Sequence, residues 1–389
     1  MNPVTGSKTV GRYTSDQHIL ARFSPEADLW LRLPAHASLA AGERLLTLPF
    51  YRPQLMLAPG IHLVVYGPAE IKLLETDAGG VPGVEMKYGR LVVMMVEESK
   101  TGLNLVIGDR RSRVLLQDLD ATLALEVRHH CAPGGNPEKD PTYRMVRIHS
   151  TGGGLTWHDQ LTGDVTNLQA DQTATMVDME SPVVSEEASP PIWLDSRDVR
   201  LIDRDASKEL EPLLTLDKPL SVSLNEQAKS RLPEVRSLAI ASLALVNEFT
   251  HYVDAFNDKE LRSYWTSLVR ALQEAMARDQ QSAARVRSTL ERLRGEEGSE
   301  LYRMLCGFSA EQLAKEDAAR LVEFLKSPSM DVRVIAFETL YRITEKTNTY
   351  RPDKDADQQK PAVMAWSRAL NNGEIVYKTP SAGLPEFPK

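Results

Sequence analysis

The sequence predicts a multidomain protein in which an all-β N-terminal domain precedes an all-α, helical-repeat-like C-terminal domain. Before about residue 225, short apolar segments are broken by Gly, Pro and Asp. After it, apolar residues recur at helical spacing in stretches rich in Ala, Leu, Glu and Arg. Strands are short and bounded by turn residues, whereas amphipathic helices repeat every three to four positions, so the change of pattern indicates a change of fold class.

We expect four segments along the chain. They are a flexible N-terminus at 1–16, an all-β domain at 17–177, a linker rich in Pro, Ser and acidic residues at 178–231, and a helical domain with a C-terminal tail at 232–389. Adjacent prolines at 190–191 favour an extended spacer. The apolar triplet Ile192-Trp193-Leu194 interrupts this linker, and we expect it to dock on a neighbouring domain.

In the first domain, the predicted strands are short and evenly spaced. They lie at 43–48, 54–57, 61–66, 70–74, 84–88, 90–96, 103–107, 113–116, 122–128, 143–149, 154–157 and 165–169. Turn residues separate them, which is typical of hairpin connections. The spacing favours a sandwich, a barrel or an irregular β-solenoid.

Several short motifs in this domain occur in a characteristic order. Gly42-x-x-Leu45-x-Thr47 is followed by Leu55-x-Leu57-x-x-Gly60, by Ile71-x-Leu73, and by Gly89-x-x-x-Val93. Together they resemble the FecR-type domain. The resemblance implies an all-β, usually extracytoplasmic domain that follows a membrane span and a sigma-factor-binding helix bundle. It also makes Gly89 a candidate structural residue.

The second domain contains clear helical patterns. We expect helices at 232–245, 261–277, 282–294, 299–307, 317–325, 331–344 and 362–370. The 261–277 helix carries one apolar face, formed by Leu261, Tyr264, Trp265, Leu268, Leu272 and Met276. Trp265 is therefore a candidate core residue. Ser309 and Gln312 have the spacing of a capping box that begins another helix.

Two of these helices begin alike. Glu234-Val235-Arg236 and Asp331-Val332-Arg333 are each followed three residues later by Ala. This pattern resembles the second helix of HEAT-type repeats and implies that the acidic residue caps, the Arg reaches a neighbouring turn and the Ala allows close packing. Arg236 and Arg333 are thus candidate structural residues. The alternative is a plain helix bundle in which the match is coincidental.

No catalytic, cofactor-binding or metal-binding residues are predicted. His129 and Cys131 are the best metal ligands by composition, but no partner set has the required spacing. His149, Ser150, His158 and Asp159 lie close in sequence without the motif that surrounds a nucleophilic serine. These residues do not indicate an enzyme.

Three further features have ordinary structural interpretations. Gly152–Gly154 lacks the Lys-Ser/Thr of a phosphate-binding loop and is interpreted as a hairpin turn. Arg110-Arg111-x-Arg113 is interpreted as a solvated loop. Cys131 and Cys306 lie in different halves of the chain and are expected to be independent thiols.

Charge and hydropathy restrict the partners. The formal net charge is −8, with 54 acidic and 46 basic residues, which argues against broad nucleic-acid binding and favours a basic or mixed-charge protein partner. No apolar run is long enough to span a bilayer. A missing upstream anchor would place the chain on the extracytoplasmic side of the inner membrane; otherwise we expect it in the cytoplasm.

These observations predict a non-enzymatic sensing or scaffold protein that needs no cofactor. The FecR-like and HEAT-like resemblances together imply a bacterial signalling system, in which the helical domain binds a protein partner. The alternative is a cell-envelope or glycan-binding protein that uses the β domain.

Overall fold

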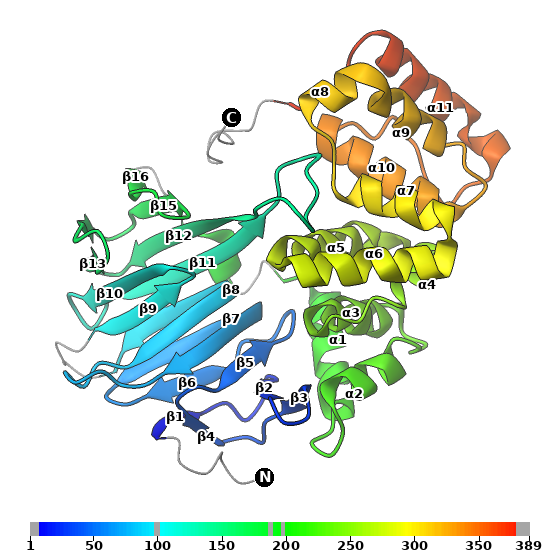
Figure 1. Ribbon diagram of the computed structural model, residues 1–389. Helices are drawn as coiled ribbons and strands as arrows, with labels where there is room; N and C mark the ends of the chain where they lie inside the picture. The colour runs from blue at the N-terminus through cyan, green and yellow to red at the C-terminus, as the bar shows by residue number, and fades with distance from the viewer. Residues whose placement is uncertain (1–7, 97–101, 186–189, 196–198, 379–389) are drawn as a thin grey trace. The chain divides into compact units, whose positions relative to one another are not determined.

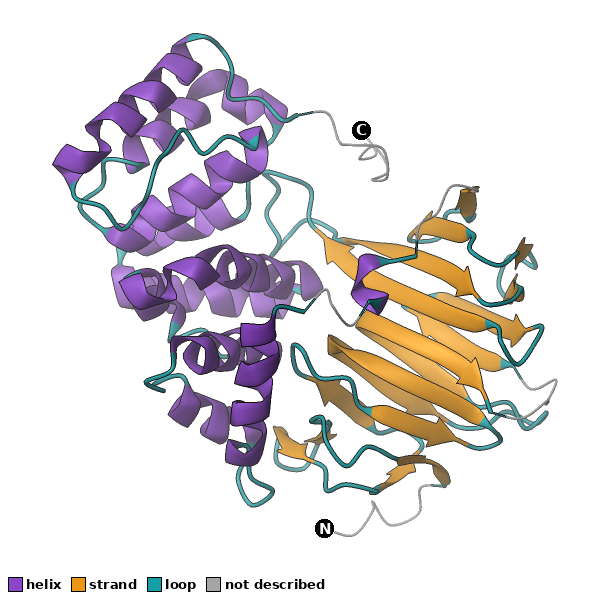
Figure 2. Ribbon diagram, turned by 180° about the vertical axis from the view of Figure 1, so that it is seen from behind, coloured by secondary structure: helices purple, strands orange, loops and turns teal. Residues whose placement is uncertain are grey.

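The computed structural model describes residues 8–96, 102–185, 190–195 and 199–378. The chain divides into two compact units (Figure 1). Unit 1 comprises Met1–His129 and Tyr143–Ser230, and unit 2 comprises His130–Thr142 and Arg231–Lys389. The predicted order, a β-rich part followed by a helical part, is confirmed (Figure 2).

Unit 1 is built around one mixed sheet of 16 strands. The strands are β1 Thr9–Tyr13, β2 Ala21–Ser24, β3 Leu29–Arg32, β4 Ser38–Ala40, β5 Arg44–Thr47, β6 Gln54–Leu57, β7 Ile61–Leu74, β8 Gly83–Met95, β9 Leu103–Ile107, β10 Arg110–Leu116, β11 Thr122–His130, β12 Tyr143–Thr151, β13 Leu155–Asp159, β14 Val165–Leu168, β15 Thr173–Val177 and β16 Val183–Ser185. Strand β1 shows that the predicted flexible N-terminus extends too far, since Thr9–Tyr13 pairs with both β4 and β6. Residues 1–7 lie outside the described part.

The long hairpin β7–β8 organises the sheet. At the open end of the hairpin, β7 pairs with β6 and β8 pairs with β11. Near the turn, β7 pairs with β5 and β8 pairs in parallel with β9. The register between β7 and β8 shifts between Tyr66 and Glu70, where the ladder is irregular. Core residues from both ends, such as Leu63 and Leu73, belong to one buried cluster. The described sheet path runs from β14 to β16, which makes the sheet open rather than a closed barrel.

The predicted linker differs from the structure. Helices α1 Leu201–Leu210 and α2 Leu220–Gln227 occupy much of it, with the short 3₁₀ turn η3 Glu211–Leu213 between them, and they belong to unit 1. Leu210 of α1, Leu224 of α2 and Leu214, which follows η3, are buried. Short apolar runs within a Pro-rich, acidic segment thus suffice to dock it, because an existing sheet supplies the rest of the core.

The apolar triplet in this segment docks as predicted. Turn η1 Ile192–Leu194 places Trp193 against Val92 and Ala124 in a second, smaller cluster. The Trp193 ring also meets Tyr66 edge-on, with 5.1 Å between ring centroids. Trp193 therefore covers the outer face of β8 and β11.

Unit 2 is helical. Its elements are α3 Pro233–Leu243, η4 Ala244–Val246, α4 Tyr252–Phe256, η5 Lys259–Tyr264, α5 Trp265–Arg278, α6 Gln280–Arg294, α7 Glu296–Leu305, α8 Ala310–Gln312, the π-helical turn η6 Leu313–Asp317, α9 Ala318–Phe324, α10 Met330–Thr344 and α11 Ala356–Asn371. The capping box of Ser309 and Gln312 is confirmed, since both reciprocal hydrogen bonds are present. All six residues of the predicted apolar face are buried.

One segment of the predicted β domain belongs to unit 2. Residues His130–Thr142 connect β11 to β12, yet their contacts are with helices. Glu138 forms an ion pair with Arg287 of α6 at 2.8 Å. The sequence gives no periodic signal for such an insertion, because the contacts are made by turns and single side chains.

Candidate functional site

The matched helix starts place their arginines in different surroundings. Arg236 forms ion pairs with Asp258 at 2.7 Å and Glu260 at 2.8 Å. Arg333 instead donates hydrogen bonds to the backbone carbonyls of Ser327, Pro328 and Pro352. Both guanidinium groups hold neighbouring turns, which is a structural role.

The acidic residue of the second motif also has defined partners. Asp331 is completely buried, and its Oδ2 lies 2.9 Å from Nε of Arg294. The N-cap of α10 is Ser329, which makes no side-chain cap hydrogen bond, whereas Asp331 accepts a hydrogen bond from the first-turn backbone N–H of Val332 at 3.0 Å and also pairs with Arg294 of α6. Burial raises the pKa of the Asp331 carboxyl, while the charge of Arg294 opposes that shift.

The other two structural candidates have defined positions. Trp265 is buried in unit 2, and its Nε1–H donates to the carbonyl of Ala255 at 2.9 Å. Gly89 lies in unit 1 where β8 passes Ala69, with φ of +106°. A Cβ at Gly89 would lie 2.4 Å from Cβ of Ala69, so only glycine fits this close approach.

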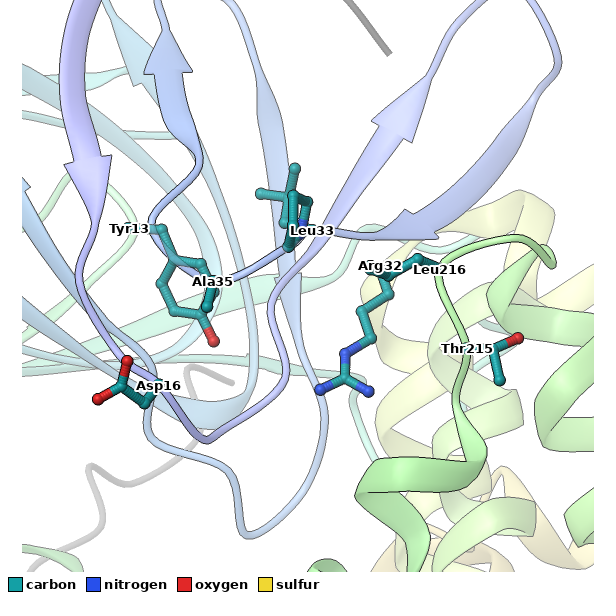
Figure 3. Close-up of a pocket in the computed structure, with 8 residues that line it drawn as sticks. Tyr13, Asp16, Arg32, Leu33, Ala35, Thr215 and Leu216 are labelled. Carbon is teal, nitrogen blue, oxygen red and sulfur yellow. The ribbon is translucent and has the colours of Figure 1, made fainter.

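A shallow pocket opens on unit 1 (Figure 3). Its volume is about 230 Å³, and its lining is Tyr13, Asp16, Arg32, Leu33, Pro34, Ala35, Thr215 and Leu216. Arg32 is its main charged group, but its guanidinium donates to the carbonyls of Glu211 at 2.7 Å and Leu214 at 2.9 Å. It also forms an ion pair with the Glu211 carboxylate at 3.3 Å. The pocket therefore marks the joint that anchors α1 and η3 to β3.

The hydroxyl and imidazole groups nearby are also used structurally. Burial raises the pKa of Tyr13 to about 12, and the charge of Glu211 adds to the shift. Burial lowers the pKa of His18, against the effect of Glu211. The Tyr51 hydroxyl donates to the carbonyl of Ser207 at 2.6 Å. These groups form a docking cluster rather than an acid–base pair.

The histidine and serine residues near position 150 do not assemble a nucleophile. His149 Nδ1 lies 2.8 Å from the hydroxyl of Thr173, and the Ser150 hydroxyl donates to the carbonyl of Gly153 at 2.6 Å. Asp159 is buried and forms an ion pair with Arg110. Each group thus has a separate partner, with no contact between a nucleophile and a base.

Two sequence interpretations need correction here. Arg110 is buried at 2% exposure instead of belonging to a solvated loop, because Asp159 compensates its charge. Gly152–Gly154 connects β12 to β13, but these strands pair with β15 and β10, so the turn is not a hairpin. Gly152 has φ of +74° in this connection.

Metal-binding geometry is not found in the described part of the chain. No group of three or more His, Cys, Asp or Glu side chains there is arranged to hold an ion. Nε2 of His129, one of the two best candidate ligands, lies 2.9 Å from the carbonyl of Lys87 and is therefore already hydrogen-bonded. Likewise, none of the helices among these residues combines the length and apolarity needed to cross a bilayer.

Sequence reasoning missed one surface of unit 2, which we call the α5–α10 face. It consists of Thr266 and Arg270 of α5 with Glu338, Tyr341 and Arg342 of α10. The Thr266 hydroxyl lies 3.1 Å from Oε1 of Glu338, which joins the two helices. Helical spacing places residues 338, 341 and 342 on one side of a helix, and this part can be read from the sequence. The pairing of α5 with α10 is a tertiary contact, which the sequence does not reveal.

The charges of this face are only partly compensated. Burial raises the pKa of the Glu338 carboxyl, opposed by the hydrogen bond from Thr266 and the charge of Arg270. Burial also lowers the pKa of Arg342. Within the described ranges, Arg270 and Arg342 have no carboxylate at ion-pair distance. Tyr341 is 41% exposed and stacks on Phe337, with 6.3 Å between ring centroids.

Comparison with protein-family models, with curated proteins and with solved structures finds no match for this chain. The FecR-like and HEAT-like resemblances therefore stay predictions that rest on the motifs alone.

Proposed function

We propose that this chain is a non-enzymatic sensing or scaffold protein of a bacterial signalling system and that it binds a protein partner through its helical unit. The observation that supports this most is the composition of the α5–α10 face. Arg and Tyr are enriched where protein interfaces gain most of their binding free energy. Here the exposed side chains of Tyr341, Arg270 and Arg342 lie within one helical turn of the Thr266–Glu338 contact.

The same face defines the chemistry of the partner. Arg270 and Arg342 can each form a bidentate pair with a carboxylate, which a lysine at these positions could not do. Glu338, which contacts Thr266, adds one acidic group to the same face. A mixed-charge protein segment that presents carboxylates to both arginines fits this arrangement.

The proposal is tested by partner capture from the native host with the full chain. The test variant reverses both charges, Arg270→Glu with Arg342→Glu. The matched control, Arg285→Glu with Arg292→Glu, changes the net charge equally on exposed positions of α6. We expect the control to capture as much partner as the wild type. The test variant should capture at least tenfold less, which corresponds to about 1.4 kcal/mol of binding free energy.

Two outcomes would contradict the proposal. Equal capture by both variants would move the binding surface away from α5 and α10. Saturable binding of envelope glycans, unaffected by either variant, would instead support the alternative of a glycan-binding β unit.

A further inference from the structure

The two cysteines lie in the same compact unit, although they are far apart in the sequence. Cys131 belongs to the inserted segment His130–Thr142, and Cys306 directly follows α7. The backbone N–H of Gly134 donates to the carbonyl of Cys306 at 3.2 Å. The Gln312 side-chain amide donates to the carbonyl of Gly134 at 3.3 Å. The turn that follows Cys131 is thus hydrogen-bonded to the turn that follows α7.

These two turns are packed at backbone distance. A Cβ placed on Gly307 would lie 3.9 Å from Cα of Pro133, and one on Gly134 would lie 2.6 Å from the amide nitrogen of Ser309. Both glycines have positive φ, +74° at Gly307 and +81° at Gly134. Cys306 immediately precedes Gly307, and Cys131 lies two residues before Pro133. The insertion therefore brings the two thiols to facing turns.

The electrostatics around the sulfur atoms is consistent with this proximity. Burial raises the pKa of Cys131 to about 11, and the charge of Asp140 adds to the shift. Burial raises the pKa of Cys306 to about 12, against the effect of Arg303 and with contributions from Cys131 and Glu138. Both residues keep partial solvent exposure. The thiols are therefore neutral near pH 7 and slow to react, yet accessible.

We propose that Cys131 and Cys306 form a redox-sensitive pair, which a low-molecular-weight disulfide such as oxidised glutathione converts into an intramolecular disulfide. One thiolate attacks the glutathione disulfide, forms a mixed disulfide and releases one reduced glutathione. The second thiolate then attacks the protein sulfur of that mixed disulfide and releases the other. The protein loses two protons and two electrons, and the glutathione disulfide takes them up.

This bond would fix the inserted segment to the end of α7. In the reduced chain, the segment is held by the hydrogen bonds of Gly134 and by the Glu138–Arg287 ion pair. A covalent bond at Cys131 would make that attachment permanent under oxidising conditions. The inference is independent of the proposed partner and of the α5–α10 face.

The test incubates the folded full chain with oxidised glutathione at about pH 8.5, where thiol–disulfide exchange is faster than at neutral pH. Remaining thiols are then alkylated, and the chain is digested without reductant. We expect both thiols to disappear together and one peptide pair, linked through Cys131 and Cys306, to be the main product. Cys131→Ser and Cys306→Ser are the controls, and each should retain a single glutathione adduct on its remaining cysteine.

Three results would overturn the inference. The first is a wild-type chain that accumulates a separate glutathione adduct on each cysteine without a linked peptide. The second is a folded chain in which neither thiol reacts, while both react after unfolding in urea. The third is a disulfide-linked dimer in place of the intramolecular product.

Discussion

Replacement of Arg333 by alanine should destabilise unit 2 markedly. The guanidinium donates four hydrogen bonds, with Nη1 reaching Ser327 and Pro328 at 2.7 and 2.9 Å and with Nε and Nη2 both reaching Pro352 at 3.1 and 3.0 Å. These bonds join the start of α10 to two other turns. Their removal leaves three carbonyls that only water can satisfy.

The magnitude follows from the type of bond. A hydrogen bond to a charged group contributes about 1.5–3 kcal/mol, and partial exposure of Arg333 places each site near the lower value. Because Arg333 holds two separate turns, we expect its removal to lower the free energy of unfolding of unit 2 by about 3 kcal/mol. For a unit of this size, that corresponds to a decrease in Tm of about 6–12 °C.

Thermal and urea unfolding followed by helical circular dichroism measure this loss. Arg333→Lys is the matched variant, since it retains the charge but cannot reach both attachment points, and it should recover about half of the stability. Arg236→Ala should cost only about 1 kcal/mol, because its partners Asp258 and Glu260 are 31% and 68% exposed and ion pairs near the surface contribute little. An unchanged Tm for Arg333→Ala, or equal effects of the Ala and Lys variants, would refute this reasoning.

Three further predictions concern other parts of the chain. Gly89→Ala should destabilise unit 1 by about 3 kcal/mol in urea unfolding, whereas Gly80→Ala, with φ of +80° and no atom within 4 Å, should cost only about 1 kcal/mol; equal losses would contradict the role of the Ala69 contact. Glu338→Gln should stabilise the fold at pH 7, because the folded-state pKa is raised and the charged form is penalised; the advantage should disappear as the pH falls below the ordinary value of 4.5, and a pH-independent difference would count against it. Arg32→Ala should release α1 and α2 and increase limited proteolysis within 199–230, with a stability loss of about 2 kcal/mol; an unchanged cleavage pattern would show that apolar burial alone holds these helices.

The sequence by itself determined the class and position of most elements. In the β7–β8 region the apolar runs at 61–66 and 90–95 lie in strands, as predicted. The expected breaks at Gly67-Pro68 and Gly89 are wrong, because 61–66 with 70–74 forms the single strand β7 and 84–88 with 90–95 lies in the single strand β8. The stripe from Leu261 to Met276 is buried as predicted, because a helix period and a strand period are local properties of the chain. Capping chemistry is equally local, and the Ser309–Gln312 box is therefore present where its spacing indicated.

Only the tertiary structure decided which separate segments meet. The pairing of β7 with β8 across its register shift, the docking of α1 by Arg32, and the pairing of Thr266 with Glu338 all join residues distant in sequence. The insertion of 130–142 into unit 2 likewise brings Cys131 to the turn after α7. Periodicity specifies which face of an element is buried, but the free energy of packing is shared among many long-range contacts. The partner of each face is therefore set only when the whole chain has folded.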